Sequence, residues 1–347
     1  MDFSLFYFAD EATAGTATGT GRYDLLMAGA RYADAHGFSA VWTPERHFHP
    51  FGGLYPNPAV TGAAVAAVTD RVAVRAGSVV APLHHPARIA EEWSVVDNLS
   101  GGRAGVALAS GWHVRDFALR PEAYEDRKQV LVRTAETVRR LWRGESVTFP
   151  DGNGDPVDVR IFPPPLQPDI PLWVTSAGSI DTFRTAGELG AGVLTHLLGQ
   201  ELPELSGKIE AYRAAFAADH PQRAGDANVV VMLHALLGTD RETVRTQIRE
   251  PFSAYLRSSI GLIAKGAGGL DPDELSPDDI DYIVTRSFDR YFDTAGLFGT
   301  VDDAVKLVDQ LQRIGVDDIA CLIDFGVPHD VVIAGLDYLG EARRATA

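Results

Sequence analysis

Several ionisable side chains follow directly after a short apolar run near the start of the chain. Glu45, Arg46 and His47 come just past the run Ser39–Trp42. Polar residues beyond a strand's carboxyl end lie at the mouth of an α/β fold, where catalytic sites are built. His47 is the leading candidate for a general acid or base because histidine titrates near neutrality, with Glu45 or Arg46 orienting it or the substrate. The alternative is a solvated loop with a local Glu–Arg pair, in which His47 only hydrogen-bonds to the rim.

Small residues and hydroxyls lie at the ends of three further apolar runs. Small side chains allow a flat ligand to approach the backbone, and the ring of Trp112 offers a wall for it. A turn of small residues that opens a helix presents free N–H groups that suit a phosphate, although Ser179 fits equally well as an ordinary N-cap. The residues concerned are Gly77, Ser78, Ser110, Gly111, Trp112, Ser176, Ala177, Gly178 and Ser179.

Short β-rich runs alternate with helical patterns along the chain. Several runs are apolar without alternation, as in parallel strands buried on both faces. Eight such strands predict an α/β fold, a (β/α)8 TIM barrel, in which all the features above share one rim. A doubly wound sheet is the alternative that this pattern leaves open. The predicted strands are Phe3–Phe8, Ser39–Trp42, Val72–Val80, Gly105–Ala109, Leu172–Thr175, Gly192–Thr195, Asn228–Leu237 and Asp318–Ile323.

Three helices between these runs are clear in the sequence. Apolar residues from Ile89 to Leu99 recur at helical spacing after Pro86, a residue suited to the first turn of a helix. Two more helices are predicted over Glu122–Arg143 and Thr300–Ile314.

Two segments do not fit the barrel repeat. Residues 145–171 combine the strand-like VTFP and VDVRIF with several prolines, which predicts a β-hairpin insertion. Residues 258–298 form a long excursion before the last strand–helix unit and contain the tract KGAGGLDPDELSPDD. A connection of this length is typical of a lid or a binding loop. Because no linker or internal repeat is evident, one domain is predicted over residues 1–347.

Charge and composition exclude several classes of function. The net charge of −16 disfavours nucleic acid as a partner, because phosphate binding relies on clustered Lys and Arg. The single cysteine, Cys321, rules out an internal disulfide, and His84 and His85 lack the neighbours of a metal site, so no metal is expected. The N-terminus predicts a first strand rather than a signal peptide, and no apolar run approaches the roughly 20 residues of a membrane span. A cytoplasmic protein is therefore expected.

The motifs ERHF, PLHHPxRxAE and LSGGRxxxxxxxG, followed by a Ser-Ala-Gly-Ser turn, occur in this order along the chain. Their order and spacing resemble the bacterial luciferase-like flavin monooxygenases over residues 1–240 and 295–335. The full forms TPERHFHPFGG and VLTHLLGQ resemble a subgroup from natural-product assembly lines, which includes enzymes that act on carrier-tethered amino acids. The resemblance implies a barrel that uses molecular oxygen and FMN, taken as FMNH2 from a separate flavin reductase. A homo-oligomer, a dimer or a tetramer, is also expected.

The resemblance assigns roles to particular residues. The isoalloxazine would lie over a non-proline cis peptide bond and be flanked by the residues after the fourth strand, and the phosphate would be held after the fifth strand. The residues are Gly77 and Ser78 at the cis bond, Ser110 and Gly111 beside the flavin, and Gly178, Ser179 and Thr182 at the phosphate.

Two departures from luciferase bear on the reaction. Luciferase has Glu-His-His where this chain has Glu45-Arg46-His47, so neither aldehyde chemistry nor light emission is expected. The basic residue that luciferase offers to the phosphate corresponds to Ser110. The phosphate charge must therefore be met elsewhere, and Arg184 is the candidate that the sequence suggests.

The resulting prediction is a two-component monooxygenase that uses FMNH2 and O2 to hydroxylate an acyl or aminoacyl group tethered to an acyl or peptidyl carrier protein. Carrier proteins are generally acidic, so an acidic chain needs a local basic patch to attract one. Two alternatives stay open: a deazaflavin-dependent reductase or dehydrogenase of the same superfamily, and a non-catalytic flavin-binding protein. The basic residues around the long excursion that would form the patch are Arg249, Arg257, Lys265, Arg286 and Arg290.

Overall fold

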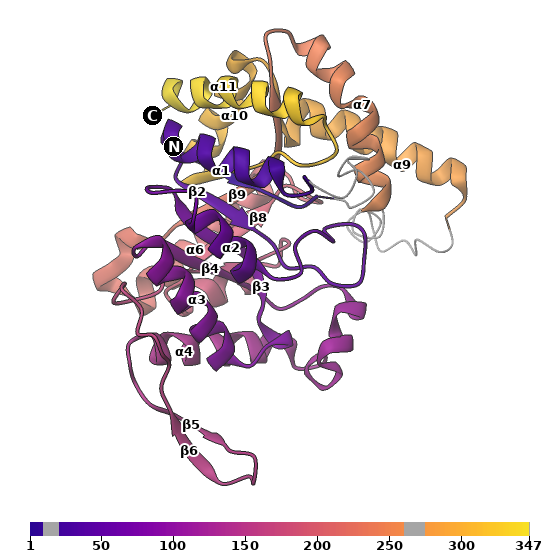
Figure 1. The fold of residues 1–347 in the computed structure, drawn as a ribbon. Coiled ribbons are helices and arrows are strands. Elements are labelled where there is room, and N and C mark those ends of the chain that lie inside the picture. The colour runs from indigo at the N-terminus through magenta and orange to yellow at the C-terminus, as the bar shows by residue number, and fades with distance from the viewer. Residues whose placement is uncertain (10–20, 260–274, 347) are drawn as a thin grey trace.

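Parallel strands form the wall of a barrel, and helices surround it (Figure 1). The computed structural model describes residues 1–9, 21–259 and 275–346. All the predicted strands are present, each within two residues of its predicted ends. The barrel strands are β1 (Asp2–Phe6), β2 (Ala40–Thr43), β3 (Ala73–Val80), β4 (Ala104–Ala109), β7 (Leu172–Thr175), β8 (Gly192–His196), β9 (Val229–Leu237) and β11 (Asp318–Leu322).

The strands close into a ring. Their hydrogen-bonded order is β9-β11-β1-β2-β3-β4-β7-β8, and β8 pairs in turn with β9. This closure confirms the (β/α)8 TIM barrel and excludes the doubly wound alternative, whose sheet would have two open edges. A further strand, β10 (Leu297–Gly299), pairs with the carboxyl end of β9 from Ala235 onward. Three residues carry too little pattern for such a strand to be predicted from the sequence.

The helices follow the strands and cover the outside of the barrel (Figure 1). They are α1 (Asp24–His36), α2 (Pro58–Ala66), α3 (Pro86–Ser100), α4 (Arg127–Trp142), α5 (Ile180–Glu188), α6 (Leu202–Asp219), α7 (Arg241–Ser258), α9 (Pro277–Arg290), α10 (Val301–Arg313) and α11 (His329–Ala345). Pro86 opens α3 as predicted, and Thr300 caps α10 in a capping box with Asp303. Leu99 is exposed, so the buried face of α3 runs through Ile89 and Trp93 but does not include it.

The helix predicted from Glu122 begins later, at Arg127. Two 3₁₀ turns, Val114–Leu119 and Pro121–Ala123, take the place of its first residues. The reason is packing. Phe117 and Ala123 belong to a small buried cluster apart from the main core, and these contacts hold the chain in tight turns before the helix can start.

The first predicted insertion is confirmed as a β-hairpin. Its strands β5 (Val147–Pro150) and β6 (Pro156–Val159) pair antiparallel, with Val147 opposite Val159. The hairpin projects away from the barrel, as Figure 1 shows. The ring of Phe149, on β5, lies 4.6 Å from that of His85, the residue before α3.

The second predicted insertion lies partly outside the described residues, which resume at residue 275. The described part contains α9, which packs beside α7 and is tied to it by an ion pair of 2.6 Å between Arg257 and Asp281. A π-helical turn, Tyr291–Ala295, follows α9 and leads into β10. The long excursion therefore places a helix, and not only a loop, next to α7.

A buried ion pair lies inside the barrel. Arg75 of β3 approaches Asp318 of β11 at 3.3 Å, and Ser4 of β1 donates a hydrogen bond to the same carboxylate at 2.9 Å. The guanidinium also lies over two indole rings, 4.9 Å from the centre of Trp42 and 4.6 Å from that of Trp173. Burial lowers the pKa of Arg75 and raises that of Asp318, so each charge depends on the other.

Arg75→Met should destabilise the protein by about 3–5 kcal/mol, because it leaves the buried Asp318 carboxylate without its partner. The double variant Arg75→Met with Asp318→Asn should lose much less, since neither charge is then buried alone. Urea denaturation followed by circular dichroism measures both. Arg71→Met is the control. The Arg71 side chain is 70% exposed, and its contact with Asp34 is long, at 4.0 Å. A double variant as unstable as the single one would contradict this account.

Candidate active site

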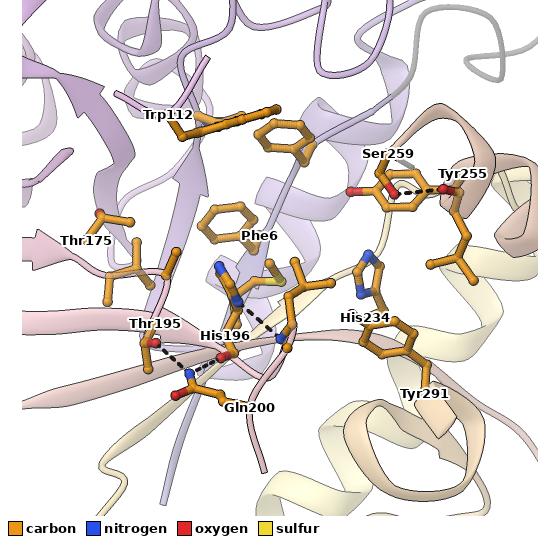
Figure 2. A pocket seen from close by; sticks show the side chains of 18 of the residues that line it. Phe6, Trp112, Thr175, Thr195, His196, Gln200, His234, Tyr255, Ser259 and Tyr291 are labelled. Atoms are coloured by element: carbon orange, nitrogen blue, oxygen red, sulfur yellow. Dashed lines mark hydrogen bonds between the residues drawn. The ribbon is translucent and has the colours of Figure 1, made fainter. Parts of the chain in front are cut away.

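A cavity of about 1240 Å³ opens at the carboxyl ends of the barrel strands. Phe6, Thr175 and His196 line it from the ends of three strands, and Tyr255 of α7 lines it from the opposite side (Figure 2). This is the face on which (β/α)8 enzymes place their active sites. The volume exceeds the roughly 300–1,000 Å³ of most single-ligand pockets, so a cofactor and a small substrate both find room.

Glu45 is the centre of a buried hydrogen-bond cluster on this cavity. It lines the cavity although its residue is only 6% exposed. Nε2 of His47 and Nε2 of His84 contact its Oε1 at 2.7 and 2.6 Å, and the N–H of Val80 donates to its Oε2 at 2.6 Å. Burial alone would raise the Glu45 pKa, but these hydrogen bonds hold it below its usual value. The same contacts raise the pKa of His84 against the effect of its burial.

His47 and Arg46 do not line the cavity themselves, but each contacts a residue that does. His47 contacts Glu45, and the Arg46 guanidinium contacts Asp116 and Trp112. Nη1 of Arg46 contacts both carboxylate oxygens of Asp116 at 2.7 Å, and the guanidinium lies 4.9 Å from the centre of the Trp112 ring. Arg46 thus fixes one wall of the cavity, and the predicted cluster is brought together in space as well as in sequence.

Small residues within the third strand and after the fourth strand form part of the wall. Gly77, Ser78 and Gly111 line the cavity, and the Gly77–Ser78 peptide bond is cis, as the resemblance implies. A Cβ at Gly77 would lie 2.5 Å from the ring of Phe6, so no larger residue fits there. Ser110 does not line the cavity, although both of its neighbours in sequence do.

Hydroxyl groups of Ser176 and Thr195 stabilise the turn before α5, residues 176–179, by hydrogen bonds. Ser176 accepts a hydrogen bond from the N–H of Gly178 at 3.3 Å through its side chain, and its carbonyl accepts one from Thr195 at 2.9 Å. Ser179 is the N-cap residue of α5, but its side chain makes no capping hydrogen bond. The ordinary-cap interpretation therefore does not account for this serine. Thr182 lies one turn into α5.

Arg184 is the residue that the sequence suggested for the positive charge near this turn. It is exposed on α5 and lies 3.3 Å from Asp181, an exposed carboxylate on the same helix. Ala177 is the residue of the turn that lines the main cavity. Lys208, on α6, lies beside the turn, because a Cβ built at Gly178 would be 3.3 Å from its Nζ.

Two histidines that the sequence analysis did not single out lie on the cavity floor. Burial lowers the pKa of His196 to about 4 and that of His234 to about 3, so both rings are neutral at pH 7. In the part of the chain that the structure describes, Nε2 of His234 has no hydrogen-bond partner. His196 ends strand β8, a position that could have marked it, whereas His234 is concealed in the apolar run of β9.

The two adjacent histidines of the motif PLHHPxRxAE have separate partners. His84 contacts Glu45, whereas His85 caps α3 by accepting a hydrogen bond from the N–H of Ala87 at 3.2 Å. Among the described residues, no three His, Cys, Asp or Glu side chains are grouped as a metal site requires. No helix in the described segments has the length and apolar character that crossing a membrane demands.

The basic residues predicted to form a docking patch are mostly engaged in contacts within the protein. Arg249 lies over the ring of Phe288, and Arg290 donates hydrogen bonds to the carbonyls of Leu197 and Gln200. Arg257 pairs with α9, and Lys265 lies outside the described residues. Arg286 is exposed at the cavity, and no described carboxylate forms an ion pair with it.

The model of the luciferase-like monooxygenases matches residues 1–318. The chain belongs to this family. It is 24% identical over 97% of its length to the oxygenase component of the flavin-dependent trigonelline monooxygenase of Acinetobacter baylyi, covering 93% of that protein. An F420-dependent glucose-6-phosphate dehydrogenase of Amycolatopsis mediterranei is 30% identical over 52% of this chain and 56% of its own. The fold matches a monooxygenase from Streptomyces bottropensis with a TM-score of 0.80 and 22% identity, covering 99% of this chain and 98% of that one.

One buried carboxyl group near the site has an unusual pKa. Asp324 accepts hydrogen bonds from the N–H of Phe8 at 2.6 Å and from the hydroxyl of Tyr55 at 3.0 Å. Burial nevertheless raises its pKa to about 7. A group whose pKa is higher in the folded state stabilises the protein below its unfolded pKa, and this contribution is lost as the pH rises toward 7.

Asp324→Asn should therefore remove the part of the unfolding free energy that the natural protein loses as the pH rises toward 7. Relative to this variant, the unfolding free energy of the natural protein should fall by about 1.4 kcal/mol per pH unit between pH 5 and pH 7. Denaturant titrations at the two pH values measure the difference. Asp181→Asn, at an exposed site, is the matched control and should change nothing between them. A difference that is constant with pH would show that Asp324 is ionised throughout.

Proposed function

We propose that this protein is the oxygenase component of a two-component monooxygenase, which takes FMNH2 from a separate reductase and uses O2 to hydroxylate a small substrate. The cavity at the barrel mouth carries this proposal. It lies on the catalytic face of a luciferase-like barrel and combines a flat wall of small residues with a buried carboxylate, Glu45. The relative from Acinetobacter baylyi, named as an oxygenase component, supports a separate reductase as partner.

The chain's own residues fit a flavin. The backbone at Gly77 and Ser78 offers the flat surface that a planar ring needs, with Phe6 filling the space behind Gly77. Gly111, which lines the cavity, would flank the ring. When bound, reduced FMN supplies the electrons that activate oxygen. The cofactor's phosphate would be held after the fifth barrel strand, by the turn residues Ser176, Ala177, Gly178, Ser179 and Thr182.

The protein's part in the reaction is to position the reactants, exclude water and handle protons. Trp112, held by Arg46, and Tyr255 cover the cavity with aromatic rings, and this limits the access of water. Glu45 stays ionised because its pKa is lowered, so it can accept a proton at Oε1 or Oε2. His47 and His84 would return that proton through their hydrogen bonds to Glu45.

A deazaflavin-dependent reductase or dehydrogenase is the second candidate. The match to an F420-dependent dehydrogenase over half of the chain favours it. Equilibrium dialysis against FMN and F420 separates the two, and preference for F420 would end the monooxygenase proposal. If FMN binds tightly but its reduced form drives neither oxygen uptake nor product, the protein is a non-catalytic flavin binder.

His47→Ala and Glu45→Gln should both lower the product formed per O2 consumed, with more peroxide released, because each disturbs proton handling at the cavity. Removal of one positioned acid or base typically costs about 10²–10⁴-fold in rate. The affinity for FMN should stay nearly unchanged. Product and peroxide are measured with a reductase and excess NADH, and His329→Ala, at an exposed histidine, is the control. Loss of FMN binding in His47→Ala would contradict these roles.

The finer proposal is a substrate tethered to an acyl or peptidyl carrier protein. Arg286 supports it, because it is exposed at the cavity and no described carboxylate forms an ion pair with it. Mass spectrometry should show faster hydroxylation of the tethered substrate than of the free acid. Arg286→Glu should raise the KM for the tethered form alone. Equal turnover of the free acid would remove the carrier protein from this account.

A further inference from the structure

Lys208 is a buried positive charge beside the cavity that the machinery above does not use. It lies in the second turn of α6, and the residue is only 7% exposed. Its Nζ donates hydrogen bonds to Oε1 of Gln200 at 2.9 Å and to Oε1 of Glu204 at 2.5 Å. Both acceptors line the cavity. A lysine is seldom buried to this extent, and the carboxylate that pairs with it here belongs to a side chain that is 56% exposed.

The ammonium group lies against the turn that opens α5. A Cβ at Gly178 would be 3.3 Å from Nζ of Lys208 and 3.5 Å from Oε1 of Gln200, and Gly178 has a φ of +117°. Gln200 also donates a hydrogen bond at 3.2 Å to Thr195, as Figure 2 shows, and Thr195 donates to the carbonyl of Ser176. Hydrogen bonds thus connect Lys208, through Gln200, to the base of the turn.

Positive charge accumulates at this place. The N-terminus of α5 carries the positive end of the helix dipole and N–H groups that lack intrahelical acceptors. The Ser179 side chain does not cap them. The carboxylate that faces Lys208 belongs to Glu204, a side chain that is more than half exposed. An ammonium group beside a helix N-terminus is unfavourable unless an anion lies between them.

We propose that Lys208 supplies the positive charge that binds the cofactor's phosphate, and that the Glu204 carboxylate pairs with the Lys208 ammonium group until the phosphate binds. This inference rests on the proposed flavin function and adds a binding residue to it. It also explains how the phosphate charge is met although Ser110 stands where luciferase has a basic residue. The positive charge comes from α6 rather than from the fourth strand or from Arg184. The bond formed is a charge-assisted hydrogen bond from Nζ to a phosphate oxygen.

Comparison of FMN with riboflavin tests the proposal, because riboflavin has the same ring system without the phosphate. In Lys208→Gln, the affinity for FMN should fall about ten- to hundredfold, and that for riboflavin should stay unchanged. Glu204→Gln should strengthen FMN binding without affecting riboflavin, because it removes the competing carboxylate. Arg184→Gln should change neither affinity. Quenching of flavin fluorescence measures all of these, with no turnover required.

The outcomes separate this inference from the proposed function. If the natural protein binds neither flavin, the flavin function itself fails. If it prefers FMN to riboflavin and Lys208→Gln keeps that preference, the role of Lys208 is wrong while the function stands. Unchanged riboflavin binding by Lys208→Gln reports that the variant is folded. Should that variant fail to fold, Glu204→Gln still decides, since unchanged FMN affinity there overturns the proposed competition.

Discussion

Closure of the barrel is the constraint on which the rest of this structure depends. The pairing of β8 with β9 completes the ring, so the carboxyl ends of all its strands meet at one rim. Inside the ring, the ion pair between Arg75 and Asp318 joins strands that are far apart in the sequence. Closure brings His196 of β8 beside His234 of β9, so both line the same cavity as Glu45 and Gly77.

At that rim, buried charged side chains are held in position by their hydrogen-bond partners. Glu45 is ionised in a buried position because hydrogen bonds from His47, His84 and the Val80 backbone compensate for lost water. Arg46 is compensated in the same way by Asp116. Each charge therefore orients its partner, and together they give the cavity a polar wall of fixed geometry.

The cavity has two chemically different ends. One holds the Glu45 cluster and Trp112, and the other holds the turn before α5, with Gln200 and Lys208 beneath it. A ligand with a planar ring and an anionic tail matches this division. The neutral rings of His196 and His234 lie on the floor, where burial keeps them uncharged at pH 7.

The sequence alone determined the strands, the hairpin and the clustering of Glu45, Arg46 and His47, because strand periodicity and short motifs are local properties. It predicted the barrel but left a doubly wound sheet open, and the pairing of β8 with β9 decided between them. Tertiary structure decided which of those side chains line the cavity. It also decided the start of α4, which the packing of Phe117 delays, and the contribution of Lys208 from another helix. Contacts between residues distant in the chain leave no periodic pattern, so charge partners and buried histidines become evident only once the barrel has closed.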